Sequence, residues 1–388
     1  MTERYFNALS AALKSAGFFR PTLVIDRNRL DNNIDRMMRG IPSHAALRVV
    51  DKSLPSVPLL RHVLSRTGAS RIMTFHLPIT RAVLNAFTDV DLLFGKPMPA
   101  AAAEQALAQA EPALRTALEH RTVWLIDTPE RLSAYASVAE RQDITLRIAF
   151  EVDVGVCRGG VGTPEALEGL VKAARAHPRL RVEGLMAYEA HIAEIPALAG
   201  GPQAEQRRVV ERFARFAACL KPEESRILNT GGSKTALLYD AALRGNDLSV
   251  GSAFVLPSDF DTPGLQGFEP AAFIATPVLK VTDAKVPGPP VLTRILSRAG
   301  LFPRRCCYIY GGAWMARPIH PPGIRENRIW GRSSNQQFME LPAEAHLQPD
   351  DMVFLRPTQS EAVLQQFGEI AVYADGQIVD TWAALPTG

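Results

Sequence analysis

Lys52 stands directly after an apolar run, Leu47–Val50, and is a candidate for covalent chemistry. A lysine amine must lose its proton before it attacks a carbonyl carbon, and removal of water from around the amine favours that neutral form. Taken alone, Lys52 is more simply explained as a solvated lysine at the end of a strand. Its chemical role therefore depends on which other residues lie near it.

A glycine-rich segment, Asn229-Thr230-Gly231-Gly232-Ser233, follows a second apolar run at Arg226–Leu228. Its backbone N–H groups can approach a phosphate, and a helix expected from Lys234 would add its positive N-terminal end. An ordinary turn between a strand and a helix explains the two glycines equally well. If both runs are strands of one parallel barrel, Lys52 and this loop share the rim where such barrels carry their chemistry. The pairing favours a phosphate-bearing aldehyde, pyridoxal phosphate.

Arg158 lies inside a third glycine-rich segment, which follows the run Ile144–Val154. An arginine keeps its proton, so its charge beside a pyridine nitrogen would hold that nitrogen unprotonated and weaken the ring as an electron sink. The alternative is that Arg158 pairs with Glu151 or Asp153 in a structural network.

The first two thirds of the chain alternate short β-branched runs with longer amphipathic stretches, as repeated βα units do. Residues 20–255 are therefore expected to form a (β/α)8 TIM-like barrel, because eight strands close a barrel without an edge. The eight expected strands are Thr22–Ile25, Leu47–Val50, Arg71–Phe75, Asp91–Phe94, Val123–Ile126, Ile144–Val154, Leu180–Ala187 and Ile227–Leu228.

Beyond Val255, prolines interrupt short runs that lack a helical period, which predicts a mainly β domain. Expected strands include Cys307–Tyr310, Met352–Leu355 and Ile370–Tyr373, the last followed by a hairpin turn at Asp375-Gly376. We expect residues 256–388, together with residues 1–19 and their helix, to form this second domain. The fold class is thus α/β, a barrel plus a β-rich domain.

The composition argues against several classes of partner. The chain has 43 basic and 40 acidic residues of mixed distribution, which indicates neither a nucleic-acid nor a membrane surface. No stretch reaches the roughly 18 apolar residues of a membrane span, and the N-terminus shows no basic leader before an apolar core. The four cysteines lack C-x-x-C spacing, which favours a reducing cytoplasm.

These residues, in this order, resemble the pyridoxal-phosphate enzymes of the alanine-racemase-like barrel type (fold type III), in the branch of D-threonine aldolase and eukaryotic-type D-serine dehydratase. The resemblance runs from Pro21-Thr22-Leu23-Val24-Ile25-Asp26 to the Asp375-Gly376 turn. It implies that Lys52 forms the Schiff base with the cofactor and that Arg158 faces the pyridine nitrogen. It also implies Tyr188 and His191 at the catalytic face, with His191 moving a proton at the substrate hydroxyl. The implied phosphate and cofactor loops comprise Thr230, Gly231, Gly232, Ser233, Gly251 and Ser252.

The chain departs from this family pattern at its metal site. Where relatives carry a His-x-Cys or His-x-Asp pair after a proline, this chain has Gln359 and Glu361 after Pro357. These two residues could hold a harder ion such as manganese or magnesium, but they are a poor zinc site. Glu361 is alternatively a candidate acid or base beside the substrate.

By this resemblance we expect a cytoplasmic pyridoxal-phosphate lyase, of aldolase or dehydratase type, acting on a small, 3-hydroxylated D-amino acid. A racemase or epimerase is the first alternative, with Lys52 on one face of the substrate and His191, Tyr188 or a residue from a partner subunit on the other. A non-catalytic protein that carries pyridoxal phosphate is the second, and an unrelated phosphate-binding barrel is the third. The resemblance also implies a homodimer.

Overall fold

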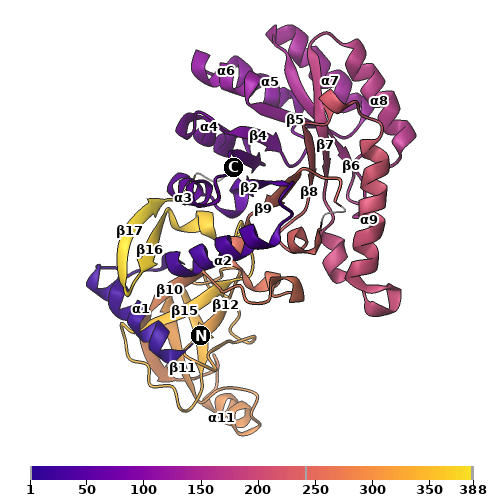
Figure 1. The fold of residues 1–388 in the computed structure, drawn as a ribbon. Helices are drawn as coiled ribbons and strands as arrows, with labels where there is room; N and C mark the ends of the chain where they lie inside the picture. The colour runs from indigo at the N-terminus through magenta and orange to yellow at the C-terminus, as the bar shows by residue number, and fades with distance from the viewer. Residues whose placement is uncertain (1, 241–242, 386–388) are drawn as a thin grey trace. The chain divides into compact units, whose positions relative to one another are not determined.

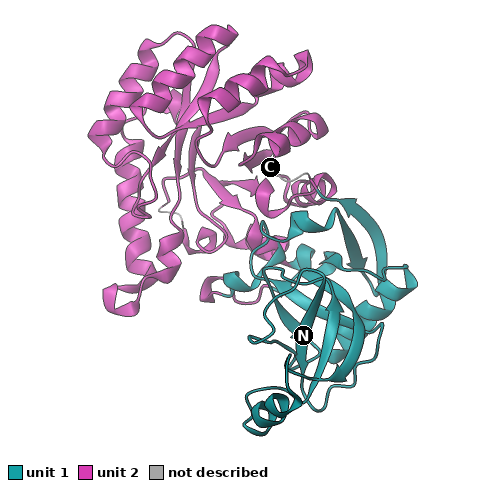
Figure 2. Cartoon of the chain, turned by 180° about the vertical axis from the view of Figure 1, so that it is seen from behind, with its two compact units in different colours: residues 1–32, 255–261, 269–384 teal, residues 33–254, 262–268, 385–388 magenta. Residues whose placement is uncertain are grey.

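The computed structural model describes residues 2–240 and 243–385, and the chain divides into two compact units (Figures 1 and 2). One unit comprises residues 33–254, 262–268 and the C-terminal residues from 385, and it contains the barrel. The other comprises residues 1–32, 255–261 and 269–384. Residues 20–32, expected in the barrel domain, thus belong to the second unit.

Eight parallel strands close the barrel in the order β2 to β9. They are β2 (Ala46–Val50), β3 (Arg71–Thr74), β4 (Asp91–Phe94), β5 (Thr122–Ile126), β6 (Leu146–Val152), β7 (Leu180–Ala187), β8 (Ile227–Thr230) and β9 (Asp247–Val250). The barrel is confirmed, but one of its expected strands is wrong. The run at Thr22 forms a strand of the other unit, and β9 takes its place by pairing with β2 and β8.

Helices follow most of the barrel strands, and local sequence signals mark where several of them begin. Thr128 caps α7, because its side chain accepts a hydrogen bond from the N–H of Arg131 at 3.1 Å. Pro112 begins α6 and so separates it from the alanine-rich α5. The helices are α2 (Arg27–Gly40), α3 (Val57–Thr67), α4 (Leu77–Ala86), α5 (Ala100–Ala108), α6 (Pro112–His120), α7 (Pro129–Gln142), α8 (Pro164–Ala176), α9 (Gly201–Ala217) and the short α10 (Ser252–Val255).

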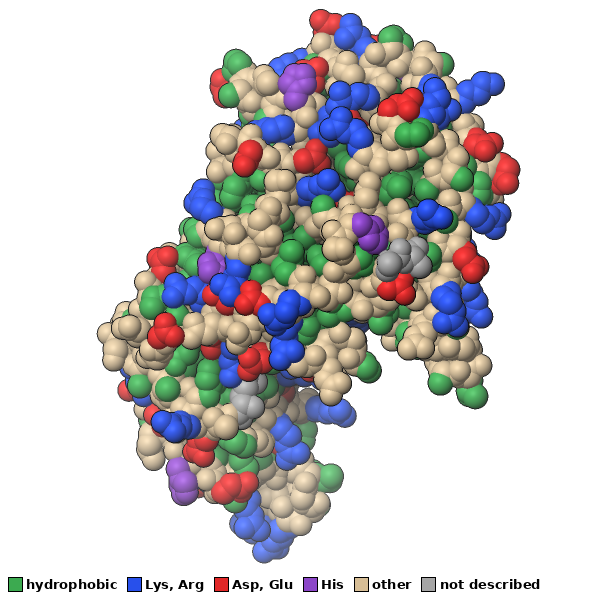
Figure 3. Space-filling model, viewed as in Figure 1, with side chains coloured by type: hydrophobic (Ala, Val, Ile, Leu, Met, Phe, Trp, Pro, Cys, Tyr) green, Lys and Arg blue, Asp and Glu red, His purple; other side chains and the backbone are tan. Residues whose placement is uncertain are grey.

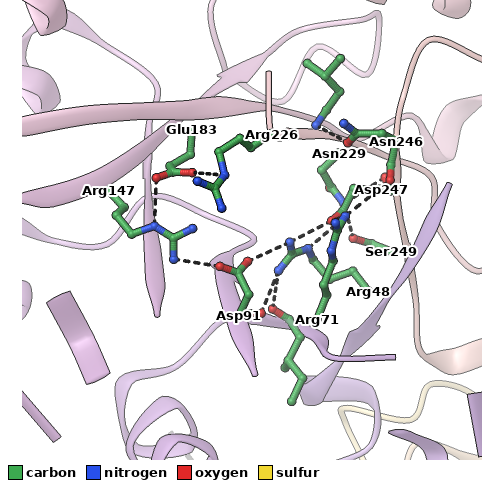
Figure 4. Close-up of polar contacts among 12 residues, drawn as sticks. Arg48, Arg71, Asp91, Arg147, Glu183, Arg226, Asn229, Asn246, Asp247 and Ser249 are labelled. Carbon is green, nitrogen blue, oxygen red and sulfur yellow. Dashed lines mark hydrogen bonds and ion pairs between the residues drawn. The ribbon is translucent and has the colours of Figure 1, made fainter. Parts of the chain in front are cut away.

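A polar network fills the barrel near the amino ends of its strands (Figure 4). Arg48 and Asp247 are both fully buried, and the guanidinium donates two hydrogen bonds of 2.8 Å to the carboxylate. Arg48 also contacts Asp91 at 3.2 Å, and Asp91 accepts a hydrogen bond of 2.8 Å from Arg147. The network lies at the end opposite Lys52, where parallel barrels carry stability rather than chemistry.

The second unit is a nine-stranded, mainly antiparallel sheet, in which β1 (Thr22–Asp26) pairs antiparallel with β10 and parallel with β16. Helix α1 (Glu3–Ser15) packs Phe6, Leu9 and Leu13 into its core. The turn at Asp375-Gly376 has positive φ at both residues, as a two-residue hairpin of type I′ requires. The remaining elements are β10 (Ala272–Asp283), α11 (Pro290–Arg298), β11 (Arg305–Tyr310), β12 (Ala316–His320), β13 (Arg325–Glu326), β14 (Gln336–Leu341), β15 (Met352–Pro357), β16 (Glu369–Ala374) and β17 (Gln377–Ala383).

The surface carries both signs of charge. On the face shown in Figure 3, lysine and arginine side chains alternate with aspartate and glutamate. Among the described residues, no helix has both the length and the apolar character needed to cross a membrane. All four cysteines are free thiols.

Candidate active site

Lys52 lies in a single 3₁₀ turn, Asp51–Ser53, which begins where β2 ends. Its ammonium nitrogen lies 4.5 Å from the centre of the Phe75 ring, just beyond the neighbouring strand β3. The turn places the lysine at the carboxyl end of the barrel strands, the end that carries chemistry in this architecture.

Hydrogen bonds connect the Lys52 turn to the glycine-rich loop. Ser252 donates to the hydroxyl of Ser53 at 3.0 Å. On either side of Ser252, the N–H groups of Gly251 and Ala253 donate to the hydroxyl oxygen of Ser233 at 3.3 and 3.0 Å. Two segments about 180 residues apart in the sequence therefore meet at one rim, with the segment after β9 between them.

Gly251 permits this close approach. A Cβ at this position would lie 2.8 Å from the Cβ of Ser53, 2.9 Å from the Cβ of Val50 and 3.0 Å from the Val50 carbonyl oxygen. Because the last of these is a backbone atom, a larger residue would move the Lys52 turn itself. Gly251 thus has a steric role beside the cofactor role that the resemblance implies.

The glycine-rich loop, which we call the phosphate loop (residues 230–233), takes its shape from Gly231, whose φ is +84°. The helix expected from Lys234 is wrong, because the following residues form only a short 3₁₀ turn, Ala236–Leu238. No helix dipole therefore supports the loop here. Its capacity to hold an anion must come from backbone N–H groups and from Ser233.

Arg158 and Tyr188 lie together beside the phosphate loop. The guanidinium carbon of Arg158 lies 4.6 Å from the centre of the Tyr188 ring, and a Cβ on Gly232 would lie 3.5 Å from that ring. Tyr188 thus spans from Arg158 to the phosphate loop. Arg158 also approaches Glu151 at 4.0 Å, so the pairing considered as an alternative is present, although more than half of the arginine side chain is exposed.

His191 contacts a carboxylate of the helix α9. Its Nε2 lies 3.3 Å from Glu205, whose other oxygen accepts a hydrogen bond of 2.9 Å from Arg208. That arginine, followed by His191, lowers the pKa of Glu205. The Nδ1 atom of His191 is buried and bonds to none of the described residues. A histidine held at one nitrogen by a carboxylate can take up and release a proton at a neighbouring substrate atom.

Two further ionisable residues, Asp51 and His76, lie near Lys52. Asp51 is fully buried, and burial raises its pKa to about 7, although Thr74 and Lys52 act against this shift. Neither of its carboxylate oxygens has a hydrogen-bond partner of normal geometry among the described residues. His76 has a pKa lowered by burial and then by the charges of Lys96 and Lys52. For Asp51 the one available sequence signal was an acidic residue directly after the apolar run Leu47–Val50.

Gln359 and Glu361, the candidate metal positions, lie in the second unit after β15. Between them, Ser360 is fully buried and donates to Glu361 at 3.2 Å. In residues 2–240 and 243–385, no three side chains of His, Cys, Asp or Glu are grouped so that they could hold a metal ion. Metal binding by this pair remains a prediction.

Comparison with known proteins gives this site a context. Residues 25–258 match the family described as alanine racemase, N-terminal domain. A 3-hydroxy-D-aspartate aldolase of Paracoccus denitrificans is 29% identical over 163 residues, which span 40% of this chain and 42% of that protein.

Two solved structures share the fold. D-threonine aldolase from Filomicrobium marinum superposes with a TM-score of 0.74 at 18% identity, over 94% of each chain. D-threo-3-hydroxyaspartate dehydratase from Delftia sp. HT23 gives 0.69 at 19% identity, over 95% of this chain and 98% of that one. With most of its barrel matched by the family and the whole fold shared with these enzymes, the chain belongs to the alanine racemase N-terminal domain family.

Proposed function

We propose that this protein is a pyridoxal-phosphate-dependent lyase that cleaves or dehydrates a small, 3-hydroxylated D-amino acid. The observation that carries the proposal is the bonded connection from Ser53, beside Lys52, through Ser252 and its neighbours to Ser233. It brings an amine and an anion-binding loop to one barrel rim. The named activities of the similar proteins, an aldolase and a dehydratase of 3-hydroxyaspartate and a D-threonine aldolase, support the choice of substrate class.

The residues of the rim fit this cofactor. Lys52 would hold the aldehyde carbon, and the phosphate loop would hold the phosphate. Ser233 suits the second task because its oxygen accepts both backbone N–H groups, so that neither contact uses its own proton. Arg158 would face the ring nitrogen, and because it keeps its proton it would limit how much charge the ring accepts.

The chain's own side chains then provide proton movement. When bound, pyridoxal phosphate withdraws electrons from the α-carbon of an attached amino acid, so that a bond to this carbon can break. His191, oriented by Glu205, would take the proton of the substrate's β-hydroxyl in an aldol cleavage or give a proton to it as it leaves in a dehydration. The Lys52 amine would serve as a second base.

Absorbance and labelling test the cofactor and the lysine. Purified protein supplied with pyridoxal phosphate should absorb in the visible range, and borohydride should fix the cofactor to the peptide that contains Lys52. Lys52→Ala should lose both the colour and the label. Lys96→Ala is a matched control, because Lys96 is an exposed lysine whose charge also reaches His76, and it should keep both. A label that persists in Lys52→Ala would contradict the proposal.

The products of D-threo-3-hydroxyaspartate test the reaction. Aldol cleavage yields glycine and glyoxylate, whereas dehydration followed by hydrolysis yields oxaloacetate and ammonia. Appearance of the enantiomer or epimer without either pair would instead establish a racemase or epimerase. An unchanged visible spectrum on addition of this substrate, D-serine and D-threonine would indicate a non-catalytic carrier. A cytoplasmic homodimer stays a prediction, which light scattering and cell fractionation can test.

A further inference from the structure

Glu189 is a fully buried carboxylate directly beneath the phosphate loop. One of its oxygens accepts a hydrogen bond of 3.0 Å from the Thr230 hydroxyl, and the other accepts one of 2.8 Å from Thr235. The N–H of Gly231 and the hydroxyl of Tyr239 also hydrogen-bond to it. Glu189 therefore holds the start of the loop and Thr235, two residues beyond its end.

These contacts decide which groups of the loop can face a phosphate. A threonine hydroxyl has one proton, and Thr230 and Thr235 direct theirs to Glu189. Gly231 directs its N–H to the same carboxylate. The N–H groups of Gly232 and Ser233 and the Ser233 hydroxyl are the donors that remain in the loop. Glu189 thus binds some of the loop's hydrogen-bond donors and leaves the others available to a ligand.

Among the described residues, the partners of Glu189 are uncharged hydrogen-bond donors rather than cations. No lysine or arginine in the described part of the chain forms an ion pair with it, and the nearby Lys234 lies 3.6 Å from Glu194 instead. The titratable group that faces Glu189 is Tyr239, whose pKa is raised well above its ordinary value by burial and by the glutamate's charge. Burial likewise raises the pKa of Glu189, although its hydroxyl and N–H partners oppose this. A phosphate held on the other side of Gly231 would add a like charge and favour the neutral acid further.

We propose that Glu189 is a positioning residue of the phosphate loop and that it takes up a proton from solvent when the loop binds a phosphate monoester. The inference rests on the proposed function, because it assumes that the loop holds the phosphate of a vitamin B6 compound. By linkage, the affinity for that compound must fall as the pH rises and Glu189 ionises. Each unit by which binding shifts the pKa of Glu189 corresponds to about a tenfold change in affinity.

Calorimetry with pyridoxine 5′-phosphate tests the proposal, because this ligand has the phosphate but no aldehyde to react with Lys52. Titrations between pH 6 and pH 9, each in two buffers of different ionisation enthalpy, give the number of protons taken up on binding. Wild type should take up more protons than Glu189→Gln, by at most one, and its affinity should fall more steeply than that of the variant as the pH rises. The difference between the two proteins cancels the ionisation of the ligand itself. Pyridoxine, which lacks the phosphate, should show no such difference.

The possible results distinguish a failure of the Glu189 proposal from a failure of the proposed cofactor site. If proton uptake and the pH dependence of the affinity are equal in wild type and Glu189→Gln, Glu189 does not have the proposed role. The proposed cofactor site is unaffected by that result. Failure of pyridoxine 5′-phosphate to bind either protein would overturn both. If circular dichroism shows that Glu189→Gln is unfolded, Thr235→Val replaces it, because this variant keeps the carboxylate and removes a hydroxyl that favours its charged form. Proton uptake should then move to higher pH, and an unchanged uptake curve would count against the proposal.

Discussion

Removal of Arg48 is expected to destabilise the barrel strongly. Arg48→Met keeps most of the side-chain volume but leaves Asp247 with only Arg71 and Asn229 as partners, at 2.9 and 2.6 Å. Breaking a buried ion pair by removing one partner costs about 3–5 kcal/mol, because Asp247 loses its buried partner and Arg71 compensates its charge only in part. For a unit of this size the unfolding midpoint should fall by roughly 6–20 °C, since each 1 kcal/mol shifts it by about 2–4 °C.

The loss of stability in Arg48→Met should also depend on pH. Burial by itself would raise the pKa of Asp247, but Arg48 brings it below its ordinary value, so in wild type this group loses stability only in strong acid. In Arg48→Met the group that lowers the pKa of Asp247 most is lost, so this folded-state pKa should rise relative to wild type although Arg71 and Asn229 remain. The deficit in the free energy of unfolding should therefore grow as the pH rises and Asp247 ionises.

Urea unfolding followed by circular dichroism at pH 5 and pH 7.5 measures this deficit. Arg48→Met/Asp247→Asn should recover part of it, because the uncompensated charge is gone. Arg141→Met is the matched control: it breaks an exposed pair with Glu104 of similar length, 2.7 Å, and should leave the midpoint close to that of wild type. A deficit below about 1 kcal/mol at both pH values, or one that grows toward acid pH, would refute this account of the buried pair.

Two further substitutions test the barrel. Gly184→Ala should lower the free energy of unfolding by about 3 kcal/mol or more. A Cβ there would lie 1.7 Å from the carbonyl oxygen of Ile227, and the φ of +157° disfavours a side chain. A thermal unfolding midpoint within a few degrees of wild type would contradict this. Asp51→Asn should remove a pH dependence: with a folded pKa of about 7 against 3.8, the aspartate costs on the order of 4 kcal/mol as the pH rises through that window. Urea unfolding at pH 5 and pH 8 should therefore show a steeper loss in wild type than in the variant, and parallel losses would disprove the shift.

Local sequence patterns predicted most of the barrel and of the candidate site. They failed for elements whose contacts are with residues far away in the sequence. The run Thr22–Asp26 is buried at every residue, just as a barrel strand would be, but its partners β10 and β16 lie about 250 and 350 residues further along the chain. Strand β9 was missed because its four residues include Asp247 and Ser249, whose partners are the buried polar groups of the network.

The same limit applied to single residues. Lys52 and the phosphate loop could be associated because each follows an apolar run, and their shared rim follows from barrel geometry. Arg48 interrupts an apolar run and looks like a surface residue in the sequence, yet it is fully buried. Glu189 carried no sequence signal of its own, because its burial depends on Thr230, Thr235 and Tyr239, which lie more than 40 residues downstream.

The distribution of the chain between its two units has a consequence for biosynthesis. Residues 2–32 are synthesised well before β16, a partner of their strand, which lies more than 300 residues further along. At a translation rate of about 5–20 residues per second, the core residues Phe6, Leu9 and Leu13 wait roughly 20–70 s for their sheet. The barrel residues 33–254 emerge in the meantime. Until β16 is made, Phe6, Leu9 and Leu13 lack the sheet that buries them, and a chaperone that binds ribosome-attached chains should recognise these residues.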